Sequence, residues 1–474
     1  MRLEFKVLSE DEIKKIHNTS LKVLEQIGIR MPHPEALNVM EQVGAKVERN
    51  SALVKMPPQL VMDCVAKAPK SVTLYGRDPI YDMNVKEDGP FYGTMTGATH
   101  FLDFKTGERR YCTNADLADI TRLIDGLENF TWLAPITTPQ DVPKETSDWF
   151  AWVTTLKNTT KHVVGQAPGA NSVRDVIKMG SAISGSEKKF RERPFTSFGI
   201  LTRPPLQYSW LSLDGLIEIA RQKLPMYLNG GCVAGATSPV TLEGTMVQAH
   251  AEIMGGITLA QSVNPGTPMF YASWSRIMDM RTGNVSLSSP EWCIFRLGLG
   301  QLGRQLGLPI RTAAMLCDAK ISDVQAGYEK GITTLAASLG GDLISGMQLD
   351  SDKIVDLADL VIDDEVIGMV QRILRGVNVN DASIAFEVIA EVGPGGTYLD
   401  KMHTLQNYRT EIWMPKITER RTWNVWKEDG RKDGLMRAKE RAKEILASHS
   451  VEPLPKDVQH ELDTIAKNAR LVEE

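Results

Sequence analysis

The sequence predicts an α/β fold: a (β/α)8 TIM-type barrel with an N-terminal appendage of helices and β-hairpins and a C-terminal helical extension. From Asn114 onward, short apolar runs alternate with helical patterns, which is typical of a parallel sheet. The repeat length of about 30–40 residues and the lack of a dinucleotide fingerprint favour a barrel over a doubly wound sheet, which stays the alternative. We expect the appendage to span residues 1–112, the barrel 113–392 and the extension 393–474.

The appendage is predicted to contain helices first and strands later. Ser9, with Glu12 three residues on, is a capping box that opens a helical pattern over residues 9–45. Pro58 starts a second, short helix. Between residues 72 and 112 the apolar period shortens to that of strands, so we expect a group of hairpins there.

Seven apolar runs are predicted as barrel strands, each followed by a helix. The eighth strand is less plain, and either Leu360–Ile362 or Ala385–Ala390 can supply it. The helices are expected at about residues 114–127, 144–159, 171–184, 209–222, 241–261, 289–306, 323–338 and 350–358. The seven strands are Phe130–Thr137, His162–Ala167, Phe195–Leu201, Pro225–Gly231, Pro268–Trp274, Ile310–Leu316 and Leu343–Gln348.

The C-terminal extension begins with a Gly/Pro turn and ends as a charged helical tail. Gly393–Gly396 is the turn, and Arg437–Glu474 carries apolar residues at helical spacing. Trp413, Trp423 and Trp426 lie between them and would suit a subunit interface. We therefore expect a homo-oligomer.

Composition excludes several classes of protein. Apolar residues make up 42% of the chain and charged residues 24%, which is a globular composition. A net charge of -5 without a strongly basic block argues against a nucleic-acid partner. No apolar run of about 18 residues is present, so we expect no membrane span. The five cysteines are scattered, without zinc spacing, and with no secretory signal they suit a reducing cytoplasm.

The residues that follow the predicted strands are polar and aromatic but hold no familiar catalytic set. The sequence places no Ser/His/acid or Cys/His group, no pair of carboxylates and no in-strand lysine at these strand ends. In a barrel the site lies at the carboxyl ends of the strands. A lining of aromatic, amide, hydroxyl and Arg side chains suits an organic cation held against aromatic faces, with Arg or amides on a polar end.

Arg311 is the strongest single candidate for a substrate-binding residue. It lies within the apolar run PIRTAAM, and a buried charge there is costly unless it is paired. One interpretation is a structural ion pair with Asp279 or Asp318. The other is an anchor for the carboxylate of a substrate.

Five further side chains are predicted to bind substrate from the strand ends and one hairpin. Trp274 is a candidate for an aromatic cage, and Tyr92, on the glycine-rich segment FYGTMTG, is a candidate lid residue. The others are amides and a phenol that follow predicted strands. They are Gln166, Tyr208 and Gln348.

The stretch Tyr227–Val240 joins an apolar strand to a Pro-started helix through Gly230, Gly231 and Gly235. A glycine turn at a helix N-terminus can cradle a phosphate. This spacing matches neither the dinucleotide pattern nor a P-loop, and no lysine follows. The glycines are therefore expected to let the backbone pass close to a ligand or to packed chain.

Five stretches, spread over nearly the whole chain, form a recognisable series. They are HNTSLKVLEQIGIRMPHPEAL, GGCVAGATSPVTLEGT, AEIMGGITLAQSVNPGTPMFYASW, DAKISDVQAGYEKGITTLAASLGGDLISG and EVGPGGTYLDKMHTLQNYRTEIWMPKITERRTW. In this order they resemble the trimethylamine methyltransferase superfamily, in its branch without pyrrolysine.

The resemblance implies a barrel that passes a methyl group from an amine to the Co(I) of a separate corrinoid protein, which docks over the mouth. The chain itself would bind no cofactor and no metal, and the cobalamin would belong to its partner. Gly230, Gly231 and Gly235 would then form a smooth wall that lets the corrinoid come close. This chemistry agrees with strand ends that offer no general acid or base.

The resemblance also bears on the substrate. Founding members that use trimethylamine carry pyrrolysine, whereas this sequence holds only the ordinary twenty residues, which favours a permanently quaternary amine. As an anchor, Arg311 would require a carboxylate on the substrate, so we expect a betaine. Glycine betaine, which would release dimethylglycine, comes first, followed by proline betaine, carnitine and γ-butyrobetaine. Such a reaction belongs to one-carbon metabolism of the methanogenic or acetogenic kind. The alternatives are a non-catalytic betaine-binding barrel and an ordinary barrel enzyme such as a lyase or an aldolase.

Overall fold

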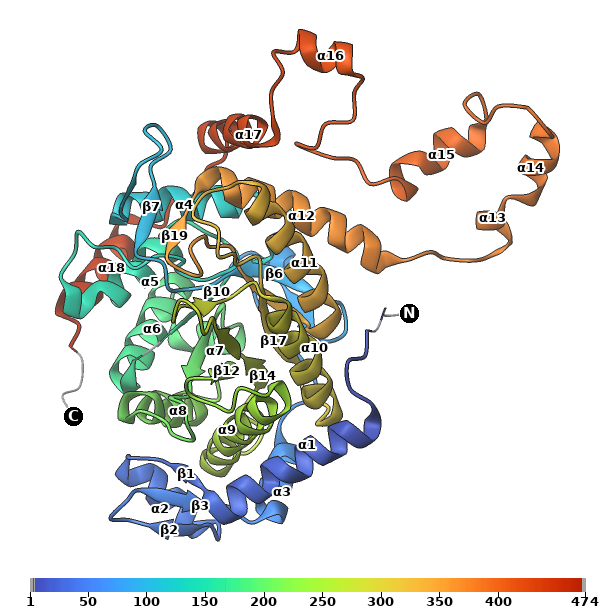
Figure 1. Cartoon of the computed structure of the whole chain (residues 1–474). Helices are drawn as coiled ribbons and strands as arrows, with labels where there is room; N and C mark the ends of the chain where they lie inside the picture. Colours follow the sequence, from blue (N-terminus) through green and yellow to red (C-terminus); the bar gives the residue numbers. More distant parts are fainter. Residues whose placement is uncertain (1–2, 4, 167, 471–474) are drawn as a thin grey trace.

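Eight parallel strands form the central barrel of the computed structural model, which describes residues 3, 5–166 and 168–470 (Figure 1). They pair in the order β6-β18-β17-β14-β12-β11-β10-β9. The main-chain N–H of Thr131 donates to the carbonyl of Tyr92 at 2.9 Å, which joins the last strand to the first. The strands are β6 (Phe91–Thr94), β9 (Trp132–Leu133), β10 (His162–Gln166), β11 (Thr196–Leu201), β12 (Met226–Gly230), β14 (Met269–Ser273), β17 (Ile310–Ala314) and β18 (Leu343–Gly346). The predicted barrel is confirmed; Ala167, predicted to end a strand, lies outside the described residues.

The strand that the prediction lacked is the first one, β6. It lies inside the predicted 1–112 appendage, so the barrel sheet begins before residue 113. Both expected positions for an eighth strand were wrong because both are helical: Leu360–Ile362 lies in α12 and most of Ala385–Ala390 lies in α14. Gly93 interrupts the alternation of apolar residues in β6. A glycine is needed at this position because a Cβ there would overlap the ring of Trp132.

A helix follows each barrel strand and packs on the outside of the sheet (Figure 1). None of the helices in the described part of the chain is long and apolar enough to cross a membrane. A short helix, α7 (Glu187–Glu192), is added after β10. The eight are α4 (Asn114–Gly126), α5 (Ser147–Lys157), α6 (Gly169–Ser184), α8 (Trp210–Gln222), α9 (Leu242–Val263), α10 (Pro290–Gln305), α11 (Val324–Gly340) and α12 (Leu357–Arg375).

Side chains alternate along each strand between the barrel interior and the helix layer. In β12, Tyr227 packs with interior residues of the barrel, whereas Leu228 belongs to the core between strands and helices. A hairpin of β4 (Val72–Leu74) and β5 (Met83–Val85) packs its four buried apolar residues against that interior. The hairpin therefore closes the amino-terminal end of the barrel.

The rest of the appendage packs against α9. The capping box of Ser9 and Glu12 is confirmed at the start of α1, but the helical pattern over residues 9–45 is broken by a small sheet. Its elements are α1 (Glu10–Lys22), a π-helical turn (Val23–Ile27), β1 (Ile29–Arg30), α2 (Pro34–Gln42), β2 (Lys46–Glu48), β3 (Leu53–Lys55) and α3 (Pro58–Lys67).

Two small sheets lie at the other end, beside the carboxyl ends of the barrel strands. One of the hairpins predicted between residues 72 and 112 is confirmed in the first of them, with its turn at Thr106-Gly107. This sheet pairs β7 (His100–Leu102), β8 (Arg109–Tyr111) and β19 (Ile354–Val355). The second pairs β13 (Val233–Ala234), β15 (Arg276–Met278) and β16 (Val285–Ser286).

The C-terminal extension leaves the barrel and returns to it (Figure 1). Four short helices project outward and bury none of their residues: α13 (Asp381–Ile384), α14 (Phe386–Val392), α15 (Met402–Glu411) and α16 (Trp423–Glu428). The predicted helical tail is confirmed as α17 (Gly434–Ser448) and α18 (Lys456–Asn468). Ile445 and Leu462 fix these two helices to the core.

A buried ion triad joins α11 to α12. The ammonium of Lys330 donates to Asp363 at 2.7 Å and also to Asp359, and all three side chains are almost fully buried. Two carboxylates left in such surroundings without their cation would be strongly destabilising. The triad therefore holds two adjacent helices of the barrel wall in register.

We expect Lys330→Met to lower the free energy of unfolding by about 3–5 kcal/mol, because it strips the cation from two buried carboxylates. Lys353→Met is the matched control. Lys353 is exposed and pairs with Asp350 at 4.0 Å, so its loss should cost less than about 1 kcal/mol. Urea unfolding followed by circular dichroism measures both, and equal midpoints would contradict the role of the triad.

Candidate functional site

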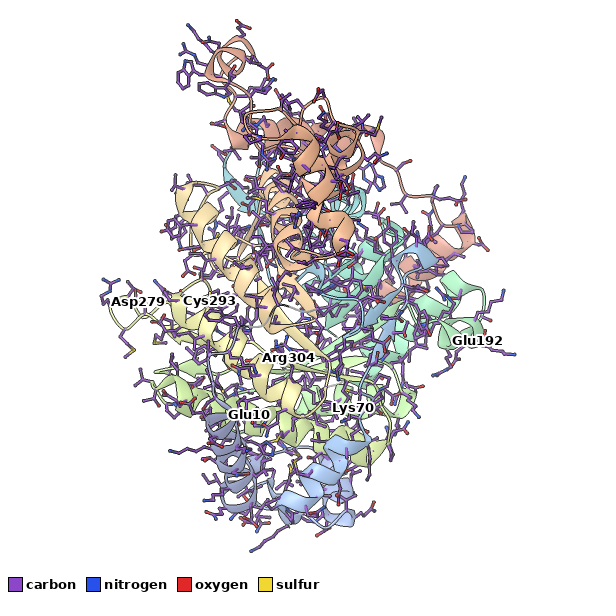
Figure 2. All side chains as sticks on the ribbon, turned by 90° about the vertical axis from the view of Figure 1, so that its right-hand side faces the viewer. Glu10, Lys70, Glu192, Asp279, Cys293 and Arg304 are labelled. Carbon is purple, nitrogen blue, oxygen red and sulfur yellow. The ribbon has the colours of Figure 1, made fainter. Side chains whose placement is uncertain are left out.

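The carboxyl ends of the strands form a mouth with two cavities. A cavity of about 1070 Å³ lies on the side of β14, β17 and β18, lined by the loop 276–289 and by residues near Asp318 and Asp350. Asp279 marks this loop, which projects from the body of the molecule (Figure 2). A smaller cavity of about 100 Å³ lies on the side of β6, β9 and β10. The mouth is thus wide on one side and narrow on the other.

Arg311 lies inside the barrel, as the second residue of β17, and only 3% of its surface is exposed. Its guanidinium carbon stands 3.9 Å from the ring centroid of Tyr227 and 5.6 Å from that of Trp132. Its Nε has no hydrogen-bond partner. Among the described residues, no ion pair involves Arg311.

The predicted carboxylate partners of Arg311 are therefore wrong. Asp279 accepts hydrogen bonds from Arg281 and Thr282 within its own exposed turn. Asp318 accepts from Ser351 at 2.9 Å and from other groups around the large cavity. Both carboxylates are engaged in loops of the mouth, away from the stacked rings.

Burial lowers the pKa of the Arg311 guanidinium, and the neighbouring Tyr227 offsets only part of this effect. A buried cation without a counter-ion is unfavourable by several kcal/mol. The free Nε–H of the guanidinium suits an anion, and a carboxylate has two oxygens that match the guanidinium fork. Arg311 is thus a buried cation that no carboxylate of the described chain neutralises.

Two buried amides near the mouth also leave an acceptor unused. The side-chain N–H of Gln348 donates to the carbonyl of Met95 at 2.6 Å, and its Oε1 has no partner. Oδ1 of Asn229 is also buried without a partner. Asn229 lies two residues after the inward-facing Tyr227, so it faces the interior as well. Sequence reasoning passed over it, although a buried Asn within an apolar strand is itself a signal.

Trp274 lies at the mouth but is largely packed. Its ring meets Trp292 edge to face at a centroid distance of 5.2 Å. The guanidinium of Arg276 stands 5.7 Å from the same ring and donates to the Trp274 carbonyl. A cation already lies beside this ring, which weakens its suitability as the wall of a cage for a second cation.

Asp148 is a residue of the mouth that sequence reasoning missed. It lines the smaller cavity with Gln166 and Thr138, and the Gln166 side chain donates to Thr96 at 3.3 Å. Solvent reaches Asp148, yet desolvation in the cavity raises the pKa of its carboxyl. No ion pair within the described part of the chain involves it. Nothing in the sequence distinguishes it from a solvated residue in the first turn of a helix.

Two predicted site residues lie outside the barrel interior. The hydroxyl of Tyr92 is hydrogen-bonded to Ser338 of α11 at 2.9 Å, so Tyr92 is a wall residue and not a lid. The hydroxyl of Tyr208 donates to the carbonyl of Glu252 in α9 at 2.8 Å. Both rings point toward the helix layer, which their sequence positions did not indicate.

The three glycines after β12 have different surroundings. A Cβ at Gly230 would meet α9, so this glycine faces outward, and Gly235 has a φ of 88° that a turn requires. A Cβ at Gly231 would meet no atom within 4 Å. Of the three, Gly231 alone borders open space.

Comparison with known proteins agrees with this fold and this mouth. The family "Trimethylamine methyltransferase (MTTB)" matches residues 2–471. Trimethylamine methyltransferase MttB of Desulfitobacterium hafniense is 33% identical over 97% of this chain and 93% of its own. Glycine betaine methyltransferase from another strain of that species is 31% identical over 99% and 98%.

Solved structures extend the likeness in fold. The monomethylamine methyltransferase MtmB of Methanosarcina barkeri superposes with a TM-score of 0.54 at 13% identity, covering 94% of this chain and 88% of that one. Its hydroxylamine complex gives a TM-score of 0.56. The chain therefore belongs to the trimethylamine methyltransferase family and is a methyltransferase.

Proposed function

We propose that this enzyme transfers a methyl group from a betaine, with glycine betaine favoured, to the Co(I) of a cognate corrinoid protein and releases the tertiary amine. The buried, unpaired guanidinium of Arg311 carries the proposal, because a substrate carboxylate would supply its missing counter-ion. Trimethylamine has no such group. The relatives include both a trimethylamine methyltransferase, at 33% identity, and a glycine betaine methyltransferase, at 31%, so the choice of a betaine rests on Arg311.

The charges of the site complement a zwitterion. Arg311 precedes the end of β17 by three residues, which places it about 10 Å below the mouth along the strand. Asp148 lines the cavity at the mouth. A betaine bound with its carboxylate on Arg311 directs its ammonium outward, toward the negative charge and toward solvent. Its methyl groups then face the side from which a partner protein can approach.

The reaction needs little from the side chains of the enzyme. The C–N bond breaks with its electron pair on nitrogen, which becomes a neutral tertiary amine. The methyl carbon forms its new bond with the electron pair of Co(I), the co-substrate on the partner. No proton moves, so the chain has to bind, orient and exclude water.

The first test mixes the enzyme with its Co(I)-loaded corrinoid protein and a betaine. We expect the absorbance of methylated corrinoid to appear together with dimethylglycine when glycine betaine is supplied. Proline betaine, γ-butyrobetaine and carnitine serve as a series of other shapes and lengths, and trimethylamine as the substrate without a carboxylate. Binding of a betaine without any transfer would identify a non-catalytic barrel instead.

We expect Arg311→Met to weaken betaine binding by about 2–4 kcal/mol, because the carboxylate loses its only buried cation in this part of the described barrel. Arg296→Met is the matched control. Arg296 is equally buried, but it donates to the carbonyls of Ser273 and Ser275 and stacks on Trp292 at 3.8 Å. Its loss should lower thermal stability rather than affinity. Calorimetric titration measures binding; unchanged affinity in the Arg311 variant would make that residue structural.

We expect Asp148→Asn to weaken binding of the ammonium end several-fold, about 1 kcal/mol, because the carboxylate remains partly solvated. In the unmodified enzyme, acidification through the raised pKa of Asp148 should weaken binding in the same direction, since protonation removes the negative charge. The Asn variant should lose this part of the pH dependence. Identical pH profiles for the two proteins would contradict the assignment.

A further inference from the structure

Residues 377–411, here called the arm, form a structured segment without a core. The arm contains α13, α14 and α15, and it projects beyond the end of α12 (Figure 1). It has regular features such as a capping box at Asn380 and Ser383. Its large apolar side chains nevertheless expose most of their surface. They include Val377, Val379, Phe386, Leu399, Met402 and Leu405, and Leu399 is 90% exposed.

So much exposed apolar surface on an ordered segment indicates an interface. Six such side chains, each with roughly 100 Å² of accessible area, supply roughly 600 Å², about three-quarters of the ~800 Å² that each partner contributes to a stable interface. The two ends of the arm are fixed. α12 enters it, and the segment after it is held by Glu365, whose carboxylate accepts main-chain N–H groups of Ile417 and Thr418.

A matching surface lies on α11 of the same chain. Val324, Tyr328 and Ile332 recur every fourth residue and are 84%, 56% and 61% exposed, so they form one apolar stripe. The stripe leads to Leu339, which lines a groove of about 360 Å³ with Phe5 and Ile13. We name this stripe and groove together the receiving face.

The charges of the two surfaces are complementary. The arm holds five acidic and two basic residues. The groove of the receiving face is lined by Lys6, Lys14 and Arg304 against the single acid Glu10. An acidic, apolar arm therefore fits a basic, apolar groove. Both surfaces belong to one chain and both are exposed in it, which is the condition for a reciprocal exchange between two copies.

We infer that the arm clasps the receiving face of a second copy of this chain, and that the second copy returns the same contact. The clasp has a consequence for the mouth. α11 begins at Val324, and the next residue, Gln325, lines the large cavity. An arm lying on Val324 therefore borders the mouth of the other copy. The dimer supplies part of the rim that a docking protein meets.

The experiment compares charge substitutions on the two surfaces in the full-length protein. The unmodified chain should sediment as a dimer or as a multiple of dimers. Leu399→Asp on the arm and Ile332→Asp on the receiving face should each raise the dissociation constant at least 100-fold. Ile80→Asp is the matched control, because Ile80 is 78% exposed but lies on neither surface. Unchanged far-ultraviolet circular dichroism shows that the variants are folded.

Cross-linking tests which surfaces meet. The five native cysteines are buried. Thr397→Cys beside the arm residue Leu399 and Gly331→Cys, where an added side chain meets no atom within 4 Å, supply one exposed thiol each. A bis-maleimide should join the two variants only when they are co-expressed. A monomer at all concentrations, a dimer that withstands both Asp substitutions, or a monomer whose arm is protected only by the corrinoid protein would each overturn the inference.

Discussion

The stacking of Arg311 on Tyr227 and Trp132 is the interaction on which the barrel interior depends. Both rings lie across the barrel because glycines face them: a Cβ at Gly93 would overlap Trp132, and one at Gly199 would overlap Tyr227. The rings hold the guanidinium in place and shield it from water, but they carry no net charge. The interior is thus well packed, but the positive charge of Arg311 has no counter-ion. An anionic ligand can supply that counter-ion.

The polar residues of the barrel lie at two levels, deep in the interior and at the rim of the mouth. At depth lie one fixed cation and two amides with unused acceptors, Asn229 and Gln348, which in the proposed reaction would bind the polar groups of the substrate. At the rim, Asp148 and the wide cavity lie at the carboxyl ends of the strands, where the proposed partner would approach. Trp274, which looked suited to a cage, instead stabilises the loop that carries Arg276. In the proposed reaction the protein would contribute position and electrostatics, and the electrons would come from the co-substrate.

Much of the fold could be predicted because seven strands are apolar runs, and Arg311 was recognisable as a charge inside one of them. The first strand could not, since the inward position of β6 is Gly93 and its apolar period is lost. Tyr92 and Tyr208 were misplaced because side-chain direction depends on which face of the strand or loop meets a helix. Asp148 was missed because a helical pattern does not say which of its polar residues borders a cavity.

The hairpin of β4 and β5 gives the barrel a closed end. Its apolar residues pack with Phe270 and Leu343 against the interior, so no route for a solute leads through that side of the described structure. In the proposed reaction, substrate and amine product would then use the opposite end of the barrel, which is also the end where the corrinoid protein would dock. For the proposed reaction this imposes a compulsory sequence: the betaine enters before the partner docks, and the amine is retained until the partner leaves. The lifetime of the protein–protein complex would thereby limit turnover.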